Sequence, residues 1–482
     1  MSFLKSTAAA AAILMALPAV SHAQSADAAL ELLSRAITYR TVKTGEFGPN
    51  QTPQYANFLK DQLVAAGFPA SAIQIDPIGD TAAFTATWQG SDPSLKPIAI
   101  IGHMDVVEAD PADWERDPFT PIIENGYIFG RGSVDNKAGL SIVMATIIKL
   151  KQAGWQPKRT IILAFSGDEE TGMVTTRHLA QKHKNVELVL NADGGGGSLD
   201  TQHNPTVYSL QGSEKTYADY TLTVTDAGGH SSRPTAGNPI YRLTAGLQRL
   251  NDYAFPVSLD EITRGYFTAA AERAQPEIAA AMRALVANDQ DQAAIATLVA
   301  NGNYTGTIRT TCTTTMIKGG HAANALPQQA QATVNCRILP GVSTAAIRDQ
   351  LQEIVADPTI KVERLETGTI AAPSSPLRAD VVAAVTAAVH SRYPDIAIVP
   401  SMSAGATDSM HFRALGIPAY GVGSVFMRSE DSFSHGLNER LPLDNLAPGI
   451  THWENPFQVK RSSTGPHTSS PPSRGGGVAT TP

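Results

Sequence analysis

The sequence predicts an α/β fold: a mixed, mostly parallel sheet covered by helices, into which a smaller α+β unit is inserted. Between residues 97 and 190, short apolar runs alternate with helix-spaced segments, which is typical of strands buried on both faces of a sheet. From residue 213 the strands show polar–apolar alternation, which is typical of a sheet with one exposed face. The length of 482 residues also favours two domains over one compact core.

The segments of the first part come in the order expected for such a sheet. Helix-spaced apolar residues predict helices at residues 27–39, 52–66 and 138–152. Apolar runs predict buried strands at residues 97–101, 160–165 and 186–190. Because open α/β sheets bind ligands beyond the carboxyl ends of their strands, we expect the functional site to follow these three strands.

The inserted unit is predicted to span residues 213–368, between two parts of the main domain at residues 24–212 and 369–454. Its order is strand, helix, strand, strand, helix, strand, at residues 218–225, 239–250, 308–318, 330–339, 344–355 and 360–365. An Ala-rich helical stretch interrupts this order at about residues 259–300.

The end of the chain changes character. From about residue 371 helix–strand alternation returns, and a last helix over residues 444–453 is expected to stop at Pro456. Residues 455–482 are rich in Ser, Pro and Gly and bury too little apolar surface to offset the entropy of ordering. We therefore expect a disordered tail over residues 455–482.

The N-terminus is predicted to be a secretory signal that is cleaved after residue 23. Lys5 precedes an apolar stretch from about residue 8 to 20, and the small residues Ser21 and Ala23 flank His22 before the expected cut. This stretch is shorter than the roughly 20 residues that a membrane-spanning helix needs. An uncleaved anchor is the alternative. We expect a periplasmic or secreted protein that has no membrane attachment after cleavage.

Charge and cysteine content narrow the function further. The net charge of −7 and the lack of a basic stripe argue against nucleic acid as a partner. The sequence has two cysteines, Cys312 and Cys336. In an oxidising compartment they either form a disulfide or remain two buried thiols, and we expect no catalytic role for either of them.

Five short acidic or histidine-bearing segments carry the candidate chemistry. They contain His103, Asp135, Glu170, Asp193 and His435, at predicted strand ends or beside turns. Imidazole nitrogens and carboxylate oxygens are zinc ligands, and a bridging carboxylate holds two ions about 3.5–4 Å apart. With Asp135 shared, each of two Zn²⁺ ions receives three protein ligands. Taken singly, each segment also fits a solvated loop, a helix N-cap or a turn.

Two further carboxylates have separate predicted roles. Asp105, two residues after His103, is placed to accept the second ring N–H of that histidine and so to fix its tautomer. Glu169 remains without a metal and is predicted to act as general base and then as proton donor. The predicted site therefore contains five ligands, one orienting carboxylate and one base.

These motifs resemble those of the M20 metallopeptidases, a group that includes carboxypeptidase S, glutamate carboxypeptidases, aminoacylases and succinyl-diaminopimelate desuccinylases. The resemblance extends from about residue 27 to 453. Its motifs are Gly-His-Met-Asp at 102–105, Gly-Ser-Val-Asp-Asn-Lys-Ala-Gly at 132–139, Gly-Asp-Glu-Glu-Thr-Gly at 167–172 and Ser-His-Gly at 434–436. It implies a zinc exopeptidase-like fold, with the inserted unit as a lid or dimerisation domain.

The resemblance also implies how the ligands divide. One zinc ion would lie on His103, Asp135 and Asp193. The second would lie on Asp135, Glu170 and His435, with Glu169 as the catalytic base. Six further histidines are expected to be surface or packing residues: His178, His183, His203, His321, His411 and His452.

Four residues outside the metal ligands match substrate-contacting positions of the family. His230, in Gly-Gly-His-Ser-Ser, would stabilise the oxyanion, often across a dimer, and its action within one chain or across two stays open. Asn324 would lie near the substrate, and Gly405 would line the pocket. Arg337 would bind the substrate carboxylate; without the resemblance it is an ordinary exposed strand residue.

The leading hypothesis is a secreted carboxypeptidase that uses two Zn²⁺ ions to hydrolyse the amide bond next to a free carboxylate in a small peptide. Co²⁺ or Mn²⁺ would replace zinc in vitro, and the lid would form a homodimer. The enlarged insert resembles the carboxypeptidase S-like branch, whose members act on peptides or N-acyl amino acids. An N-acyl-amino-acid amidohydrolase, of the aminoacylase or desuccinylase kind, is therefore the alternative. A non-catalytic binding protein on the same fold is the alternative from another class.

Overall fold

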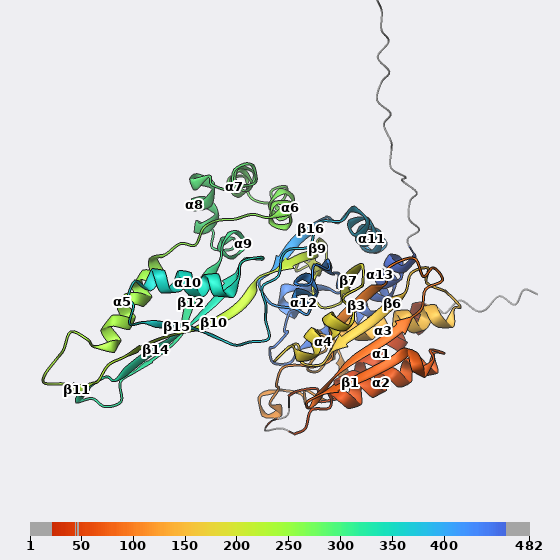
Figure 1. The fold of residues 1–482 in the computed structure, drawn as a ribbon. Helices are drawn as coiled ribbons and strands as arrows, with labels where there is room; N and C mark the ends of the chain where they lie inside the picture. Colours follow the sequence, from red (N-terminus) through yellow and green to blue (C-terminus); the bar gives the residue numbers. More distant parts are fainter. Residues whose placement is uncertain (1–21, 44, 46–47, 459–482) are drawn as a thin grey trace, which may run out of the picture.

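The computed structural model describes residues 22–43, 45 and 48–458 (Figure 1). Most of the predicted signal and the predicted tail beyond residue 458 lie outside the described residues. Helix α1 (His22–Ile37) includes the last two residues of the predicted signal. Within the described part of the chain, no helix is long and apolar enough to cross a membrane.

The main domain is built on a mixed, mostly parallel ten-stranded sheet, as predicted. Its strands follow the order β1-β2-β6-β3-β7-β17-β9-β8-β18, and β16 also pairs with β9. The neighbours β6, β3, β7 and β17 run parallel. The strands are β1 (Ile73–Ile78), β2 (Thr81–Trp88), β3 (Ile98–His103), β6 (Ile161–Ser166), β7 (Leu188–Asn191), β8 (Gly196–Leu199), β9 (Pro205–Glu214), β16 (Ile398–Ser403), β17 (Ala419–Gly421) and β18 (Phe426–Arg428).

Both faces of this sheet are covered by helices, which explains the continuous apolar runs of its strands. Along β6, Leu163 and Phe165 join the core under α1, α2, α3 and α13, whereas Ile162 and Ala164 join the core under α4 and α12. The helices are α2 (Thr52–Ala65), α3 (Lys137–Gln152), α4 (Val174–Lys182), α11 (Ala379–His390), α12 (Ser409–Arg413) and α13 (Leu446–Gln458). Short 3-10 turns are Ala70–Ala72, Pro111–Asp113, Ser429–Asp431 and Leu443–Asn445.

Helix α13 continues past the predicted stop at Pro456 and ends at Gln458. The Asn455 side chain donates a hydrogen bond to the Thr451 carbonyl oxygen at 3.1 Å, so the last turn gains a bond that does not depend on a backbone N–H. The buried Trp453 also anchors the helix in the main core. The proline therefore lies near the helix end without terminating it at that residue.

The inserted unit, called the lid below, has a separate four-stranded antiparallel sheet with the order β12-β14-β10-β15. Its strands are β10 (Thr216–Thr225), β12 (Thr311–Gly319), β14 (Gln329–Ile338) and β15 (Lys361–Leu365), and helices α5 (Pro239–Asp252) and α10 (Thr344–Val355) pack on one face. Cys312 and Cys336 are register partners on β12 and β14 and form a disulfide. Strands β11 (Gly229–His230) and β13 (Ala325–Leu326) pair at the far end of the lid (Figure 1).

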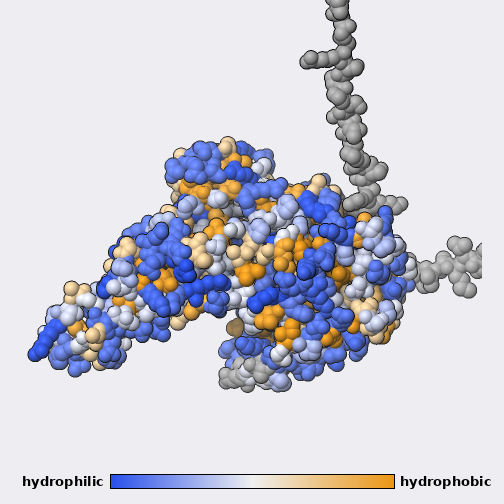
Figure 2. All heavy atoms as spheres, viewed as in Figure 1, coloured by the Kyte–Doolittle hydropathy of each residue, from blue (hydrophilic) through white to orange (hydrophobic). Residues whose placement is uncertain are grey.

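The Ala-rich stretch of the lid folds into three helices with a core of their own: α6 (Glu261–Ala270), α7 (Pro276–Ala287) and α8 (Gln292–Ala300). Short helix α9 (Thr305–Ile308) follows. Helix α6 contacts β16 of the main sheet. Figure 2 shows apolar residues on the side of this insert that faces the rest of the molecule. A small sheet of β19 (Arg440–Pro442), β5 (Tyr127–Phe129) and β4 (Ile122–Glu124) completes the fold.

Candidate metal centre

The candidate metal ligands meet at the carboxyl ends of the parallel strands. His103 is the last residue of β3, Glu170 follows β6, and Asp193 follows β7. Asp135 lies in the loop before α3, and His435 lies in the loop before β19. Because β6, β3 and β7 are neighbours in one sheet, residues far apart in the sequence come together at one edge of that sheet.

The Asp135 carboxylate lies between the two histidines. Its Oδ1 atom is 2.9 Å from His103 Nε2, and its Oδ2 atom is 3.3 Å from His435 Nε2. His103 Nε2 is also 3.8 Å from Asp193 Oδ2, and His435 Nε2 is 3.0 Å from Glu170 Oε1. The structure therefore brings all five predicted ligands together in two groups that share Asp135.

One subset of these side chains is close enough to bind a single ion. Donor atoms of His103, Asp135 and Glu170 all lie within 4.8 Å of one another, so this subset takes one member from each group together with the shared Asp135. The donors of the whole group are imidazole nitrogens and carboxylate oxygens, a set that suits Zn²⁺ and other divalent transition metals. The residues present therefore fit a metal centre.

The buried carboxylates of this cluster also favour a bound cation. Burial, with added repulsion from neighbouring carboxylates, raises the pKa of Asp193 to about 8 and raises the pKa of Glu169 well above its usual range. Hydrogen bonds to Asp135 and Glu170 raise the pKa of His435 to about 10. A divalent ion bound among these side chains would stabilise the charged form of the carboxylates and the neutral form of the imidazoles.

Asp105 holds both the first histidine and the turn that bears the predicted base. His103 Nδ1 is 3.0 Å from the Asp105 carbonyl oxygen and 3.5 Å from its carboxylate oxygen Oδ1. The carboxylate itself accepts hydrogen bonds from the backbone N–H groups of Glu169, at 3.1 Å, and Glu170, at 3.0 Å. The backbone carbonyl therefore makes the shorter contact to the ring, and the side chain orients the turn.

Glu439 is a functional candidate that the sequence reasoning missed. Its buried carboxylate accepts hydrogen bonds from the backbone N–H groups of Gly132, Val134 and Asp135 at 2.8–3.0 Å, and it pairs with Arg131 Nη1 at 2.9 Å. It lies four residues after His435, so one side chain connects the loops of two candidate ligands. Its position only four residues after the predicted ligand His435 was the one feature of the sequence that could have indicated this role.

We expect Glu439→Gln to lower metal affinity about 10- to 100-fold, because the Gln amide group would face N–H donors and displace the Asp135 loop. Unfolding should also occur at a lower temperature, since buried Arg131 loses its charge partner. Metal titration of the purified variant measures the first effect. The matched control is Glu430→Gln, which changes a half-exposed carboxylate of the same segment. Wild-type affinity in Glu439→Gln would contradict this role.

Asp408 and Asn191 are two more buried polar residues that the sequence reasoning missed. Asp408 accepts hydrogen bonds from the Ser166 hydroxyl at 2.6 Å and from the Thr176 hydroxyl. Asn191 accepts a hydrogen bond from the Asp193 N–H at 2.9 Å. Both stabilise the chain around strand ends that carry candidate ligands. Asp408 lies 242 residues after Ser166, and the Asn191 amide donates to the Ser409 hydroxyl 218 residues later in the sequence, so no local pattern reveals these contacts.

Two of the predicted substrate residues lie together where the lid joins the main domain. Arg337 on β14 donates a hydrogen bond from Nη1 to the Ala404 carbonyl oxygen at 2.9 Å, and its guanidinium lies over the Tyr217 ring at 4.7 Å. Gly405 is the next residue after Ala404, and its N–H bonds to the Ser403 hydroxyl at 3.0 Å. Among the described residues, no carboxylate forms an ion pair with Arg337.

The other two predicted substrate residues lie at the far end of the lid. His230 is on β11, its Nδ1 accepts a hydrogen bond from the Ser232 N–H at 3.2 Å, and the Asn324 carbonyl oxygen bonds to the Ser231 N–H. Figure 1 places β11 at the end of the lid that is remote from β3 and α4. In the described part of one chain, His230 and Asn324 are therefore not brought to the metal ligands.

Six further histidines, those predicted to be surface or packing residues, lie away from the candidate ligands. His411 and His452 are buried, and His183 contacts the Thr85 hydroxyl. His178 pairs with Asp76 at the surface. His203 and His321 are exposed.

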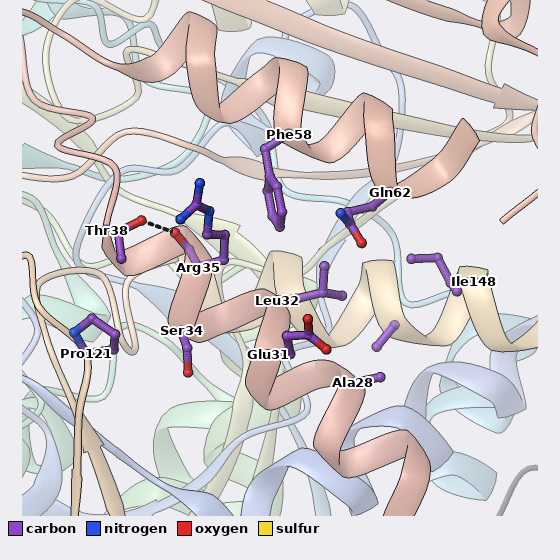
Figure 3. Close-up of a pocket in the computed structure, with 11 residues that line it drawn as sticks. Ala28, Glu31, Leu32, Ser34, Arg35, Thr38, Phe58, Gln62, Pro121 and Ile148 are labelled. Atoms are coloured by element: carbon purple, nitrogen blue, oxygen red, sulfur yellow. Dashed lines mark hydrogen bonds between the residues drawn. The ribbon is translucent and has the colours of Figure 1, made fainter. Parts of the chain in front are cut away.

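A cavity of about 520 Å³ lies between α1, α2 and α3 (Figure 3). Leu32, Phe58 and Ile148 form part of its apolar wall, and Arg35 lies beside them. The cavity is lined by none of the candidate site residues, so it is separate from the metal centre.

Comparison with known proteins identifies the class of protein that this fold and site define. Residues 99–456 match the model of Peptidase family M20/M25/M40, and the chain belongs to this family. It is 28% identical over 431 residues to "Probable carboxypeptidase S-like 2" of Dictyostelium discoideum, which covers 86% of this chain and 81% of that protein. It is 27% identical over 433 residues to "N-fatty-acyl-amino acid synthase/hydrolase PM20D1" of Mus musculus, with 86% and 84% covered. The protein is therefore a metallo-hydrolase.

Solved structures share the whole fold. An M20 family metallo-carboxypeptidase from Sulfolobus solfataricus, Sso-CP2, superposes with a TM-score of 0.68 at 22% identity, covering 89% of this chain and 98% of that chain. The di-peptidase Dug1p from Saccharomyces cerevisiae gives a TM-score of 0.65 at 19% identity, with 92% and 98% covered. These likenesses support the fold, that is, a mixed α/β main domain with an inserted second unit.

Proposed function

We propose that this protein is a two-zinc carboxypeptidase that hydrolyses the amide bond next to a free carboxylate. The observation that carries the proposal is the position of the Asp135 carboxylate between two histidines, with Oδ1 2.9 Å from His103 Nε2 and Oδ2 3.3 Å from His435 Nε2. Bound zinc would supply Lewis-acid activation of the substrate carbonyl and of the attacking water.

Glu169 would move the proton in this reaction. Its carboxylate is buried beside the ligands, and its backbone N–H is fixed by Asp105 at 3.1 Å. It would accept a proton from the attacking water and donate it to the leaving nitrogen, which balances the hydrolysis of an amide. A binding protein without turnover has no use for this carboxylate, so Glu169 favours an enzyme over the non-catalytic alternative.

Arg337 would select substrates with a free carboxylate. Its guanidinium is stacked on Tyr217 and bonded to the Ala404 carbonyl through one nitrogen, which leaves other N–H groups for a two-point contact with a carboxylate. This arrangement would explain why the cleaved bond lies beside a chain terminus or a free amino-acid carboxylate.

We expect Arg337→Ala to raise KM about 10- to 100-fold for substrates with a free carboxylate, because a charge-assisted pair contributes roughly 1.5–3 kcal/mol. The same substrates with an amidated terminus should be hydrolysed equally poorly by both forms. Steady-state kinetics on the two substrate sets measures the effect. Arg337→Lys, which keeps the positive charge but lacks the planar guanidinium, is the control. Its KM should lie between those of wild type and Arg337→Ala. Unchanged KM in Arg337→Ala would exclude the carboxylate clamp.

Hydrolysis of N-acyl amino acids is the second candidate function, favoured by the similarity to the Mus musculus N-fatty-acyl-amino acid synthase/hydrolase over 86% of this chain. Both substrate classes place a carboxylate next to the cleaved amide. A screen of zinc-loaded protein against dipeptides and N-acyl amino acids decides between them. Higher kcat/KM on dipeptides supports the carboxypeptidase, higher kcat/KM on N-acyl amino acids supports the amidohydrolase, and no hydrolysis of either class overturns both.

A homodimer through the lid would bring His230 to a metal centre. Strand β12 is the edge of the lid sheet, and its side chains Met316 and Ile317 are 68% and 58% exposed. An exposed apolar edge strand can pair with the same strand of a second copy. Mixing inactive His230→Ala with inactive Glu169→Gln would then restore activity, since each hybrid has one complete site. Permanent inactivity of the mixture would exclude action of His230 across a dimer.

Secretion is also proposed, from the signal-like N-terminus together with the disulfide between Cys312 and Cys336. Disulfides persist mainly in oxidising compartments. Fractionation of the producing cells tests this part of the proposal. Protein found in the reducing cytoplasm with residues 1–23 retained would overturn it.

A further inference from the structure

The chain returns from the lid to the main domain directly against the turn that bears Glu169 and Glu170. At Gly368 the two backbones touch: a Cβ atom added there would lie 2.6 Å from the Gly172 carbonyl oxygen and 2.9 Å from the Met173 Cβ. Real Cβ atoms essentially never approach a backbone atom so closely, and the φ angle of Gly368 is not in the left-handed region. The glycine is therefore required by space and not by backbone conformation.

The turn at residues 168–174 is held as one unit. The Met173 N–H bonds to the Asp168 carbonyl oxygen at 2.8 Å, and the Val174 N–H bonds to the Asp168 carboxylate at 2.7 Å. At its other end, the N–H groups of Glu169 and Glu170 bond to Asp105. A displacement of Gly172 by the returning chain would therefore be passed along this unit to Glu169.

The returning chain is tied to the lid on one side and to the main domain on the other. On the lid side, the Thr369 hydroxyl donates to the Tyr217 carbonyl oxygen of β10 at 2.6 Å, and Arg364 Nη2 of β15 donates to the Thr369 carbonyl oxygen at 2.9 Å. On the other side, Ala372 packs in a small buried cluster with Met173 and Met410. The segment thus connects the lid sheet to the base-bearing turn through consecutive contacts.

We propose that Gly368 is a positioning residue for Glu169: by letting the returning chain lie flat against Gly172, it sets the place of the base relative to the metal ligands. This role rests on the proposed function of Glu169. The orientation of the lid then also affects the position of Glu169, because Thr369, the next residue, is hydrogen-bonded to the lid strand β10. Misplacement of a reacting group by about 1 Å can cost a hundredfold in rate, so a small shift is sufficient.

Gly368→Ala tests this role, with Gly306→Ala as the matched control. Gly306 is also in the lid, but an added Cβ there would have its nearest neighbour, Lys215 Nζ, at 3.9 Å, which is ordinary contact. We expect Gly368→Ala to lower kcat by about 10- to 100-fold with KM within about twofold of wild type. Gly306→Ala should match wild type in both constants.

Hydrogen exchange of the metal-free protein supplies a readout that does not depend on activity. In Gly368→Ala, the peptide spanning residues 166–175 should exchange faster than in wild type, because the N–H bonds from Glu169 and Glu170 to Asp105 are disturbed. Strand β10, which is central in the lid sheet, should exchange as in wild type. Wild-type exchange over residues 166–175 together with wild-type kcat would overturn the proposal, as would a change in KM alone.

Thr369→Val provides a second variant in case the added methyl group prevents folding. It removes the hydroxyl that bonds to the Tyr217 carbonyl and adds no bulk, and we expect a smaller loss of kcat in the same direction. A wild-type kcat and exchange pattern in this variant would count against the link from the lid. If wild-type protein hydrolyses no amide substrate, the proposed function fails, whereas the exchange comparison still decides whether Gly368 positions the turn.

Discussion

Replacing Glu169 with Gln is expected to lower kcat by about a thousandfold or more, which is the upper part of the range for loss of a general base. Gln has nearly the same shape as Glu but cannot take a proton from water. Because Glu169 is outside both ligand groups around Asp135, metal content should remain at the wild-type value. The measurement is steady-state kinetics combined with elemental analysis of the same preparation.

The matched control for this variant is the neighbouring residue. Glu170 Oε1 lies 3.0 Å from His435 Nε2, in the second ligand group, so Glu170→Gln should lose metal as well as activity. A contrast between the two adjacent glutamates would separate base from ligand. If Glu169→Gln loses metal, or if it retains wild-type kcat, the role of Glu169 as base is wrong.

Replacing Asp135 with Ala is expected to have the largest effect on metal binding. One carboxylate contacts both histidines, at 2.9 and 3.3 Å, so its loss removes a ligand from both ions at once. We expect the variant to retain less than one metal per chain after dialysis and to show no measurable hydrolysis.

Asp193→Ala provides the comparison for Asp135→Ala. Of the two histidines, Asp193 lies close only to His103, with His103 Nε2 and Asp193 Oδ2 3.8 Å apart. Loss of one ion is expected there, against loss of both in Asp135→Ala. Isothermal titration with Zn²⁺ distinguishes the cases. Equal metal content in the two single variants would contradict a bridging role for Asp135.

The main sheet could be predicted because its strands carry a strong local signal. The runs that end at His103 and before Glu169 are apolar at consecutive positions, and the structure buries those positions on both faces. The candidate ligands could be chosen for the same reason, since each follows such a strand or a glycine-flanked turn. They meet because β3 pairs in parallel with both β6 and β7; a sheet with parallel strands was expected, whereas this order of the strands came only from the structure.

Other parts of the site depend on contacts that no local pattern contains. Glu439 bonds to the N–H groups of the Asp135 loop across more than 300 residues of sequence. The disulfide depends on the register of β12 against β14, which places Cys312 opposite Cys336. The close contact of Gly368 with Gly172 depends on how the lid connects to the main domain. Each of these features needed the three-dimensional arrangement.

The central claim, a two-metal amide hydrolase, is tested most directly by metal titration of chelated protein with activity as the readout. Zn²⁺ would be added in steps to metal-free protein, and hydrolysis of a dipeptide or an N-acyl amino acid with a free carboxylate would be measured at each step. The account predicts no activity without metal and full activity at about two Zn²⁺ per chain. Activity that survives chelation, or that is complete at one Zn²⁺ per chain, would contradict it.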